Sequence, residues 1–137
     1  MRVPIHKLGI VLVCTTCLSA FASGAEKKSS RALPKEAAEA IRTVAYSAMK
    51  RDFMTLRGLM VNEFTWSFGG DSDANQAIDE WKKDGRYLTE LERVLRGNCR
   101  PAEAGHIECS GRGDLSFRAG FLRTPKGWKL EYFVEGD

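Results

Sequence analysis

Apolar residues alternate with polar ones along two adjoining stretches near the C-terminus. Every second residue is apolar on both sides of the turn sequence at 124–127: Leu115, Phe117, Ala119 and Phe121 before it, and Trp128, Leu130, Tyr132 and Val134 after it. This period of two predicts a hairpin with one buried face, closed by a tight turn at Pro125 and Gly127. If Arg123 faces Trp128, the pairs that follow are Phe121–Leu130, Ala119–Tyr132 and Phe117–Val134.

Apolar spacing of three and four residues predicts four helices in the preceding part of the chain. The first spans Lys35–Lys50, and Asp52 is a suitable N-cap for a short second one that includes Phe53, Leu56, Leu59 and Met60. The third and fourth helices are marked by the apolar sets Ala74, Ala77, Ile78, Trp81 and Leu88, Leu91, Val94, Leu95, with Asp84-Gly85 between them and Gly97-Asn98 as a stop.

Two further strands complete the predicted secondary structure. Phe64, Trp66 and Phe68 alternate after Asn62 and Glu63, and 106–110 is a short strand candidate. With no internal repeat, the pattern indicates one α+β domain over 34–137.

The first 24 residues are typical of a secretory signal peptide. Arg2 and Lys7 precede an apolar run over 8–14, and Ala20-Phe21-Ala22 resembles a cleavage site. We therefore expect a signal peptide at 1–24, a flexible leader at 25–33 and a periplasmic or secreted protein. The alternative is lipidation at Cys14 or Cys17, although Val13 and Thr16 before them suit it poorly. After cleavage we expect no stable membrane insertion, because the apolar run is removed.

Composition is ordinary for a globular protein, with 43% hydrophobic and 28% charged residues. The formal net charge is +3, and losing Arg2 and Lys7 with the signal peptide takes it to about +1. A nearly neutral domain is not expected to bind nucleic acid.

Cys99 and Cys109 remain after export, and two cysteines in an oxidising compartment most simply form a disulfide. The bond would close a ring of about eleven residues and contribute about 3 kcal/mol in the chain-entropy model. A metal site at Cys99, His106 and Cys109 is the alternative, but it lacks a fourth ligand. We predict no metal and no cofactor.

Catalytic motifs are sparse. His106 is the only histidine after export, so any nucleophilic triad must use it. A carboxylate pair could act as acid and base near the glycine turn, although capping and solvation explain the same residues: Asp71, Asp73, Asp79 and Glu80. Arg112-Gly113-Asp114 matches an adhesion tripeptide and is equally a turn sequence. We predict that the protein is not an enzyme.

Two sets of side chains are candidates for binding. An apolar pocket between the sheet and the first helix would use Tyr46, Trp66, Phe68, Trp81 and Tyr132. A mixed surface suited to a protein partner would use Asp71, Arg118, Lys129, Glu131 and Phe133.

Several segments together resemble NTF2-like domains, the SnoaL and ketosteroid-isomerase superfamily. They are the two N-terminal helices, Arg51-Asp52-Phe53, 56–60, Phe64-Thr65-Trp66 and the ending 127–137. The chain also resembles uncharacterised exported proteins of Gram-negative bacteria that share an FGGD turn and a terminal GD. The resemblance implies helices on a curved, mainly antiparallel sheet that encloses a cone (the cystatin-like arrangement). Because 85–97 is predicted to be helical where the family often has a strand, we expect a reduced cone.

The functional hypothesis that follows is a non-catalytic periplasmic domain that binds a protein. One version is an immunity or inhibitor protein against an envelope-acting toxin or hydrolase. The alternatives are a small-molecule binder with an NTF2-like pocket and an enzyme that uses Asp71 with a second carboxylate.

Overall fold

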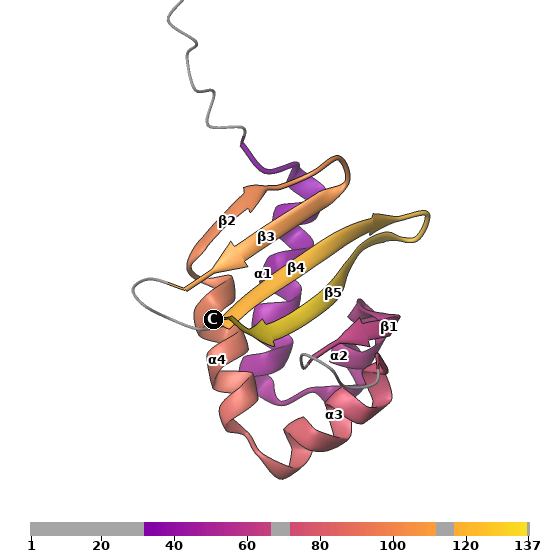
Figure 1. Cartoon of the computed structure of the whole chain (residues 1–137), viewed down its shortest axis with the longest axis vertical. Helices are drawn as coiled ribbons and strands as arrows, with labels where there is room; N and C mark the ends of the chain where they lie inside the picture. The colour runs from indigo at the N-terminus through magenta and orange to yellow at the C-terminus, as the bar shows by residue number, and fades with distance from the viewer. Residues whose placement is uncertain (1–31, 67–71, 112–116, 137) are drawn as a thin grey trace, which may run out of the picture.

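Within residues 32–66, 72–111 and 117–136, which the computed structural model describes, four helices lie against one five-stranded sheet (Figure 1). The predicted α+β class is therefore confirmed. In chain order the elements are α1 (Lys35–Lys50), α2 (Phe53–Leu59), β1 (Met60–Thr65), α3 (Ala74–Lys83), α4 (Arg86–Leu95), β2 (Asn98–Pro101), β3 (His106–Ser110), β4 (Phe117–Thr124) and β5 (Gly127–Glu135).

The strand order across the sheet is β1-β5-β4-β3-β2. β2, β3, β4 and β5 pair antiparallel in succession, and β1 joins β5 in parallel, so the sheet is mainly antiparallel as expected. In the view of Figure 1 the strands β2–β5 lie in front of α1, so the helices cover the rear face of the sheet. The front face has no helix over it among the described residues.

Local sequence signals place the helix ends well. α1 has the predicted bounds, and the Asp52 side chain accepts a hydrogen bond from the Thr55 backbone N–H at 3.1 Å at the start of α2. Asp73 caps α3 in the same way through Asn75 N–H, at 2.7 Å. These two caps satisfy backbone donors that have no partner in the first turn of a helix.

The core forms between the helices and the rear face of the sheet. Trp81 of α3 is 1% exposed and contacts Phe64 and Phe133 edge to face, with ring centroids 5.7 and 5.9 Å apart. α1 contributes Ala37, Ile41, Val44 and Ala48, and α4 contributes Leu88, Leu91, Val94 and Leu95. Burying each large aliphatic or aromatic side chain stabilises the fold by about 1.5–3 kcal/mol.

The β4–β5 hairpin corrects part of the predicted register. Arg123–Trp128 and Phe121–Leu130 pair as expected, but a bulge at Glu131 then shifts the pairing by one residue. Ala119 faces Phe133 instead of Tyr132, and Phe117 faces Glu135 instead of Val134. Beyond the bulge Phe133 is therefore buried and Tyr132 is only partly buried, the reverse of the prediction, whereas Ala119 and Val134 are buried as expected.

β2 was not predicted, because Gly97 and Asn98 were interpreted only as the stop of the preceding helix. Gly97 is also needed where the chain enters β2, since a Cβ there would lie 2.2 Å from the Ser110 carbonyl oxygen. The first predicted strand also begins earlier than expected, at Met60, and within the described residues it ends at Thr65, so Trp66 lies outside it. Phe68 lies outside the described residues.

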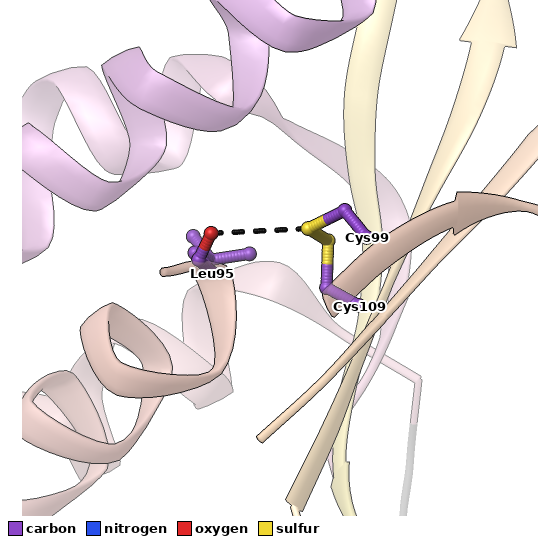
Figure 2. The surroundings of a disulfide bond; sticks show 3 residues. All are labelled: Leu95, Cys99 and Cys109. Atoms are coloured by element: carbon purple, nitrogen blue, oxygen red, sulfur yellow. Dashed lines mark hydrogen bonds between the residues drawn. A yellow bond between two sulfur atoms is a disulfide. The ribbon is translucent and has the colours of Figure 1, made fainter. Parts of the chain in front are cut away.

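The predicted disulfide is confirmed, and it joins two paired strands. Cys99 and Cys109 are direct neighbours in the β2–β3 register, with an S–S distance of 2.06 Å (Figure 2). Cys99 Sγ also lies 3.8 Å from the Leu95 carbonyl oxygen at the end of α4. A disulfide sulfur has no proton to donate, so this approach is a packing contact. The bond holds the edge strand β2 onto the sheet beside α4.

Candidate functional site

The face of the sheet that no described helix covers is the candidate site, and we call it the open face. Its side chains form three rows across neighbouring strands, as the pairing registers define them. The first row is Asn98, Ser110, Arg118 and Val134; the second is Arg100, Glu108, Gly120, Tyr132 and Thr65; the third is His106, Leu122 and Lys129. Positions between these rows point to the core.

The second row crosses all five strands and is organised by Tyr132. Its ring lies flat over Gly120, where a Cβ would come within 1.9 Å of Tyr132 Cε1. Because Gly120 has no side chain, the Tyr132 hydroxyl reaches across β4 and donates a hydrogen bond to Glu108 Oε2 at 3.1 Å. Arg100 Nη2 approaches Glu108 Oε1 at 3.9 Å from the edge strand. Tyr132 and Glu108 are thus held in place by a contact within the sheet.

Tyr132 has the largest electrostatic perturbation on this face. Partial burial of the phenol, followed by the nearby negative charge of Glu108 and their hydrogen bond, raises the pKa of Tyr132 from 10.0 to about 12. The Arg118 guanidinium acts in the opposite direction and is a smaller influence. At neutral pH Tyr132 is therefore a proton donor to Glu108, and it is not poised as a general base.

Glu131 owes its position to the bulge in β5. Its Oε2 lies 3.5 Å from His106 Nε2 on β3, and both side chains are partly exposed. The other ring nitrogen of His106, Nδ1, is buried without a hydrogen-bond partner among the described residues. The pair joins the second and third rows of the open face.

A shallow depression of about 380 Å³ lies beside Tyr132, and it is open to solvent. It is lined by Thr65, Arg118, Glu131, Tyr132 and Val134. Within the described part of the chain Arg118 makes no ion pair, and the Glu131 carboxylate lines the same depression. Lys129 differs, because its Nζ donates a hydrogen bond to the Gly58 carbonyl.

The structure does not bring the predicted pocket residues together. Trp81 is fully packed in the core, whereas Tyr46 is 60% exposed on the outer side of α1. Trp66 is partly buried against the core, and its indole nitrogen has no hydrogen-bond partner among the described residues. Tyr132 lies on the open face, and Phe68 is outside the described residues. Tyr46, Trp81 and Tyr132 therefore cannot wall one pocket, because they lie on different faces of the helices and the sheet.

The predicted binding surface is corrected at one residue. Arg118, Lys129 and Glu131 all lie on the open face, as their positions in the hairpin predict. Phe133 is 1% exposed and stacks on Phe117, with ring centroids 5.1 Å apart, so its expected surface position was wrong. The bulge at Glu131 turns Phe133 inward. Asp71 lies outside the described residues.

The structure also bears on the two alternative sites, a metal site and a pair of catalytic acids. Both sulfurs of Cys99 and Cys109 are bonded to each other, which contradicts a metal site that uses them as thiolates. Asp79 and Glu80 pair with lysines on their own helix, Lys82 and Lys83. In the described ranges no group of three or more His, Cys, Asp or Glu side chains could hold a metal ion.

No helix among these residues is both long and apolar enough to span a bilayer.

Sequence reasoning missed Glu108, Thr65 and Val134 as parts of the open face. Val134 was predicted to be buried, and it is 5% exposed, but it also lines the depression on this face. Gly120 was the signal that could have found these residues, since a glycine inside a strand marks a bulge or a close approach by a neighbouring group. Here the neighbouring group is the ring of Tyr132.

No protein-family model matches the sequence, and no curated protein matches it. Similar solved structures are NTF2-like proteins, the superfamily that the sequence resembles. An NTF-2 like protein of unknown function from Shewanella oneidensis covers 74% of this chain and 97% of its own, with 9% identity and a TM-score of 0.49. An NTF2-like protein with a cystatin-like fold from Novosphingobium aromaticivorans covers 74% and 79%, with 16% identity and a TM-score of 0.43.

A third similar structure is an LEH-like epoxide hydrolase from M. tuberculosis. It covers 74% of this chain and 81% of its own, with 11% identity and a TM-score of 0.37. That activity belongs to the mycobacterial protein. The predicted FGGD turn, at 68–71, lies outside the described residues.

Proposed function

We propose that this chain is an exported, non-catalytic domain that binds a protein partner through the open face of its sheet. The observation that carries the proposal is the row of Arg100, Glu108, Tyr132 and Thr65 on an uncovered sheet face, in which Tyr132 is hydrogen-bonded to Glu108 and Arg100 lies 3.9 Å from the same carboxylate. Side chains that are already ordered lose little conformational entropy when a partner binds.

The chemistry of the open face suits a protein surface. It mixes an aromatic ring, aliphatic side chains and both signs of charge, and its Arg118 guanidinium makes no ion pair among the described residues. Tyrosine and arginine are the residue types that most often dominate protein interfaces. The Tyr132 hydroxyl is already engaged by Glu108, which supports a role in recognition over one in proton transfer.

Export is supported by the Cys99–Cys109 disulfide, since such bonds persist in oxidising compartments. Together with the predicted signal peptide at 1–24, it favours the periplasm of a Gram-negative cell. In its most specific form, the protein is an immunity or inhibitor protein that blocks an envelope-acting toxin or hydrolase. If the protein is such an inhibitor, the bound toxin or hydrolase should lose its activity.

Site-specific photo-crosslinking in the periplasm tests the proposal. A photoreactive amino acid replaces Leu122 on the open face, and in a second strain Lys126 in the exposed β4–β5 turn as a matched control. We expect one discrete protein adduct from position 122 and none from 126. Adding Arg118→Glu should abolish the adduct, whereas Lys126→Glu should leave it.

Two results would overturn this proposal. One is a set of adducts at position 122 that is indifferent to Arg118→Glu. The other is a monomer that forms no adduct from the open face and retains a small molecule in native mass spectrometry.

The depression beside Tyr132 favours a second candidate function, the binding of a small anionic molecule. Its volume of about 380 Å³ and the Arg118 guanidinium fit a carboxylate with an apolar body that rests on Val134. Native mass spectrometry of the purified protein distinguishes the two functions. A retained mass that is lost in Arg118→Ala supports the small ligand, and its absence together with a protein adduct supports the protein partner.

A further inference from the structure

A second surface lies on the outer side of the helices, away from the sheet. Here α1 and α4 pack side by side (Figure 1). An open groove of about 530 Å³ lies between them. We call it the α1–α4 groove, and it is lined by Ile41, Arg42, Ala45, Tyr46, Met49, Leu95 and Arg96. None of these residues belongs to the open face.

Large apolar side chains are exposed along this groove. Tyr46 is 60% exposed and Met49 is 46% exposed, one turn apart on α1, whereas Ile41 and Leu95 below them are buried. Within the described residues, three large hydrophobic side chains are this exposed, and the third is Met54 just beyond α1. Clustered apolar exposure of this kind marks an interaction surface, and methionine adapts its shape to a partner.

The rim of the groove is positively charged. Arg42 makes no ion pair within the described part of the chain, and the Lys50 ammonium lies 5.6 Å from the centroid of the Tyr46 ring. Arg96 is bound to Glu92 of its own helix at 2.7 Å. The apolar floor is therefore bordered by three cations and one carboxylate, which favours an acidic occupant.

Charge and shape also discriminate among possible occupants. In a two-fold dimer the same patch meets itself, so a second copy would bring Arg42 and Lys50 near their own counterparts. An anionic bilayer attracts cations, but it is a broad surface and cannot fill a concavity between two helices. An amphipathic helix fits both features, because its apolar stripe fills such grooves and its flanks can carry carboxylates.

We propose that the α1–α4 groove binds an acidic amphipathic helix of a protein partner. Apolar side chains of that helix pack on Tyr46, Met49 and Leu95, and carboxylates on its flanks pair with Arg42 and Lys50. This site is separate from the open face and goes beyond the proposed function.

Selection of peptides against the disulfide-bonded, mature protein tests this site. The probe is a random display library of peptides about 15 residues long, which is enough for four helical turns. We expect enriched peptides with apolar residues at three- and four-residue spacing and with Asp or Glu beside them. Their affinity should fall about tenfold in Arg42→Glu and in Tyr46→Ala, and it should fall with added salt.

Matched variants test whether the selected peptides bind in the groove. Arg42→Lys keeps the charge and should retain most of the affinity, while Arg118→Glu on the open face should have no effect. Circular dichroism of each variant checks that the helices persist, because Arg42 and Tyr46 are exposed and their substitution leaves the core intact.

Each contrary outcome overturns the proposal in a defined way. No enrichment, or peptides whose binding ignores Arg42 and Tyr46, would show that the groove is not a helix site. Binding only to vesicles of anionic phosphatidylglycerol, lost in Arg42→Glu, would assign the groove to a membrane. Self-association lost in Tyr46→Ala would assign it to a second copy of the chain.

Discussion

The two faces of the sheet use the same strands in different ways. On the covered face, Phe121, Leu130 and Phe133 are at most 1% exposed and pack against helices. On the open face, Glu108 and Tyr132 lie in line with Gly120 and are stabilised by each other. Neighbouring residues on one strand thus face opposite environments, the core on one side and solvent on the other.

A single bulge in β5 determines which aromatic side chain faces the core and which lies on the open face. Glu131 adds one residue to β5, so Tyr132 turns outward and Phe133 turns inward. Without the bulge, an aromatic ring would still enter the core, but the ring on the open face would lose its contact with Glu108. The comparison predicts that substitutions on the covered face will mainly change stability, whereas those on the open face will mainly change recognition.

The largest effect is expected from truncating the core aromatic Trp81. Trp81→Ala removes the ring that contacts Phe64 and Phe133, and it should lower the free energy of unfolding by about 3–5 kcal/mol. Urea unfolding monitored by circular dichroism measures this loss. Arg118→Ala on the open face is the matched control and should change stability by less than about 0.5 kcal/mol. Equal losses in the two variants would contradict the comparison.

The second-largest effect is expected from removing the disulfide, because this bond holds the edge strand β2, which has side chains on both faces of the sheet. Replacing Cys99 and Cys109 together by alanine should lower stability by about 3 kcal/mol, the chain-entropy value for a ring of this size. Thermal unfolding of the double variant, compared with the parent under oxidising and reducing conditions, measures the effect. If reduction does not destabilise the parent, the bond contributes nothing to stability.

Gly120→Ala sharpens the comparison at the second row of the open face. A Cβ at this position would overlap the ring of Tyr132, so we expect a loss of about 1–3 kcal/mol from overpacking. The Gly120→Ala/Tyr132→Ala pair should lose less than the sum of the two single variants, because removing the ring removes the overlap. Strictly additive losses in denaturant unfolding would place the ring elsewhere.

The smallest effect concerns the Tyr132–Glu108 hydrogen bond. Tyr132→Phe should lower the free energy of unfolding by about 0.5–1.5 kcal/mol at neutral pH, while the other residues of the second row keep their positions. The pKa of Tyr132 is raised from 10.0 to about 12 on folding. The contribution of the neutral phenol to the free energy of unfolding is therefore complete below pH 10.0, and it is lost as the pH rises toward about 12.

Two measurements check this dependence. Ultraviolet titration of tyrosinate should find one late-titrating phenol in the parent protein that is absent from Tyr132→Phe. Glu108→Gln should move that titration to lower pH, because the neighbouring negative charge is removed. A parent protein whose tyrosines all titrate together would contradict the burial of Tyr132 and its contact with Glu108.

Much of the architecture could be predicted, because its signals are local. Helical spacing and caps gave the bounds of α1 and the starts of α2 and α3, and the turn at 124–127 set the first pairs of the hairpin. The disulfide followed from counting the cysteines that remain after export. The predicted cavity failed because Trp81 and Tyr46 were assigned by residue type, which does not say on which side of an element an aromatic side chain lies.

Local patterns were enough to predict the helices, the hairpin turn, the cysteine pair and the α+β class, since each depends on residues that are close together in the chain. Long-range contacts set three other features: which face of β5 points outward, the path of Tyr132 across Gly120 to Glu108, and the groove between α1 and α4. These features depend on contacts between distant strands and helices, where a single inserted residue reverses the alternation and no local pattern records it.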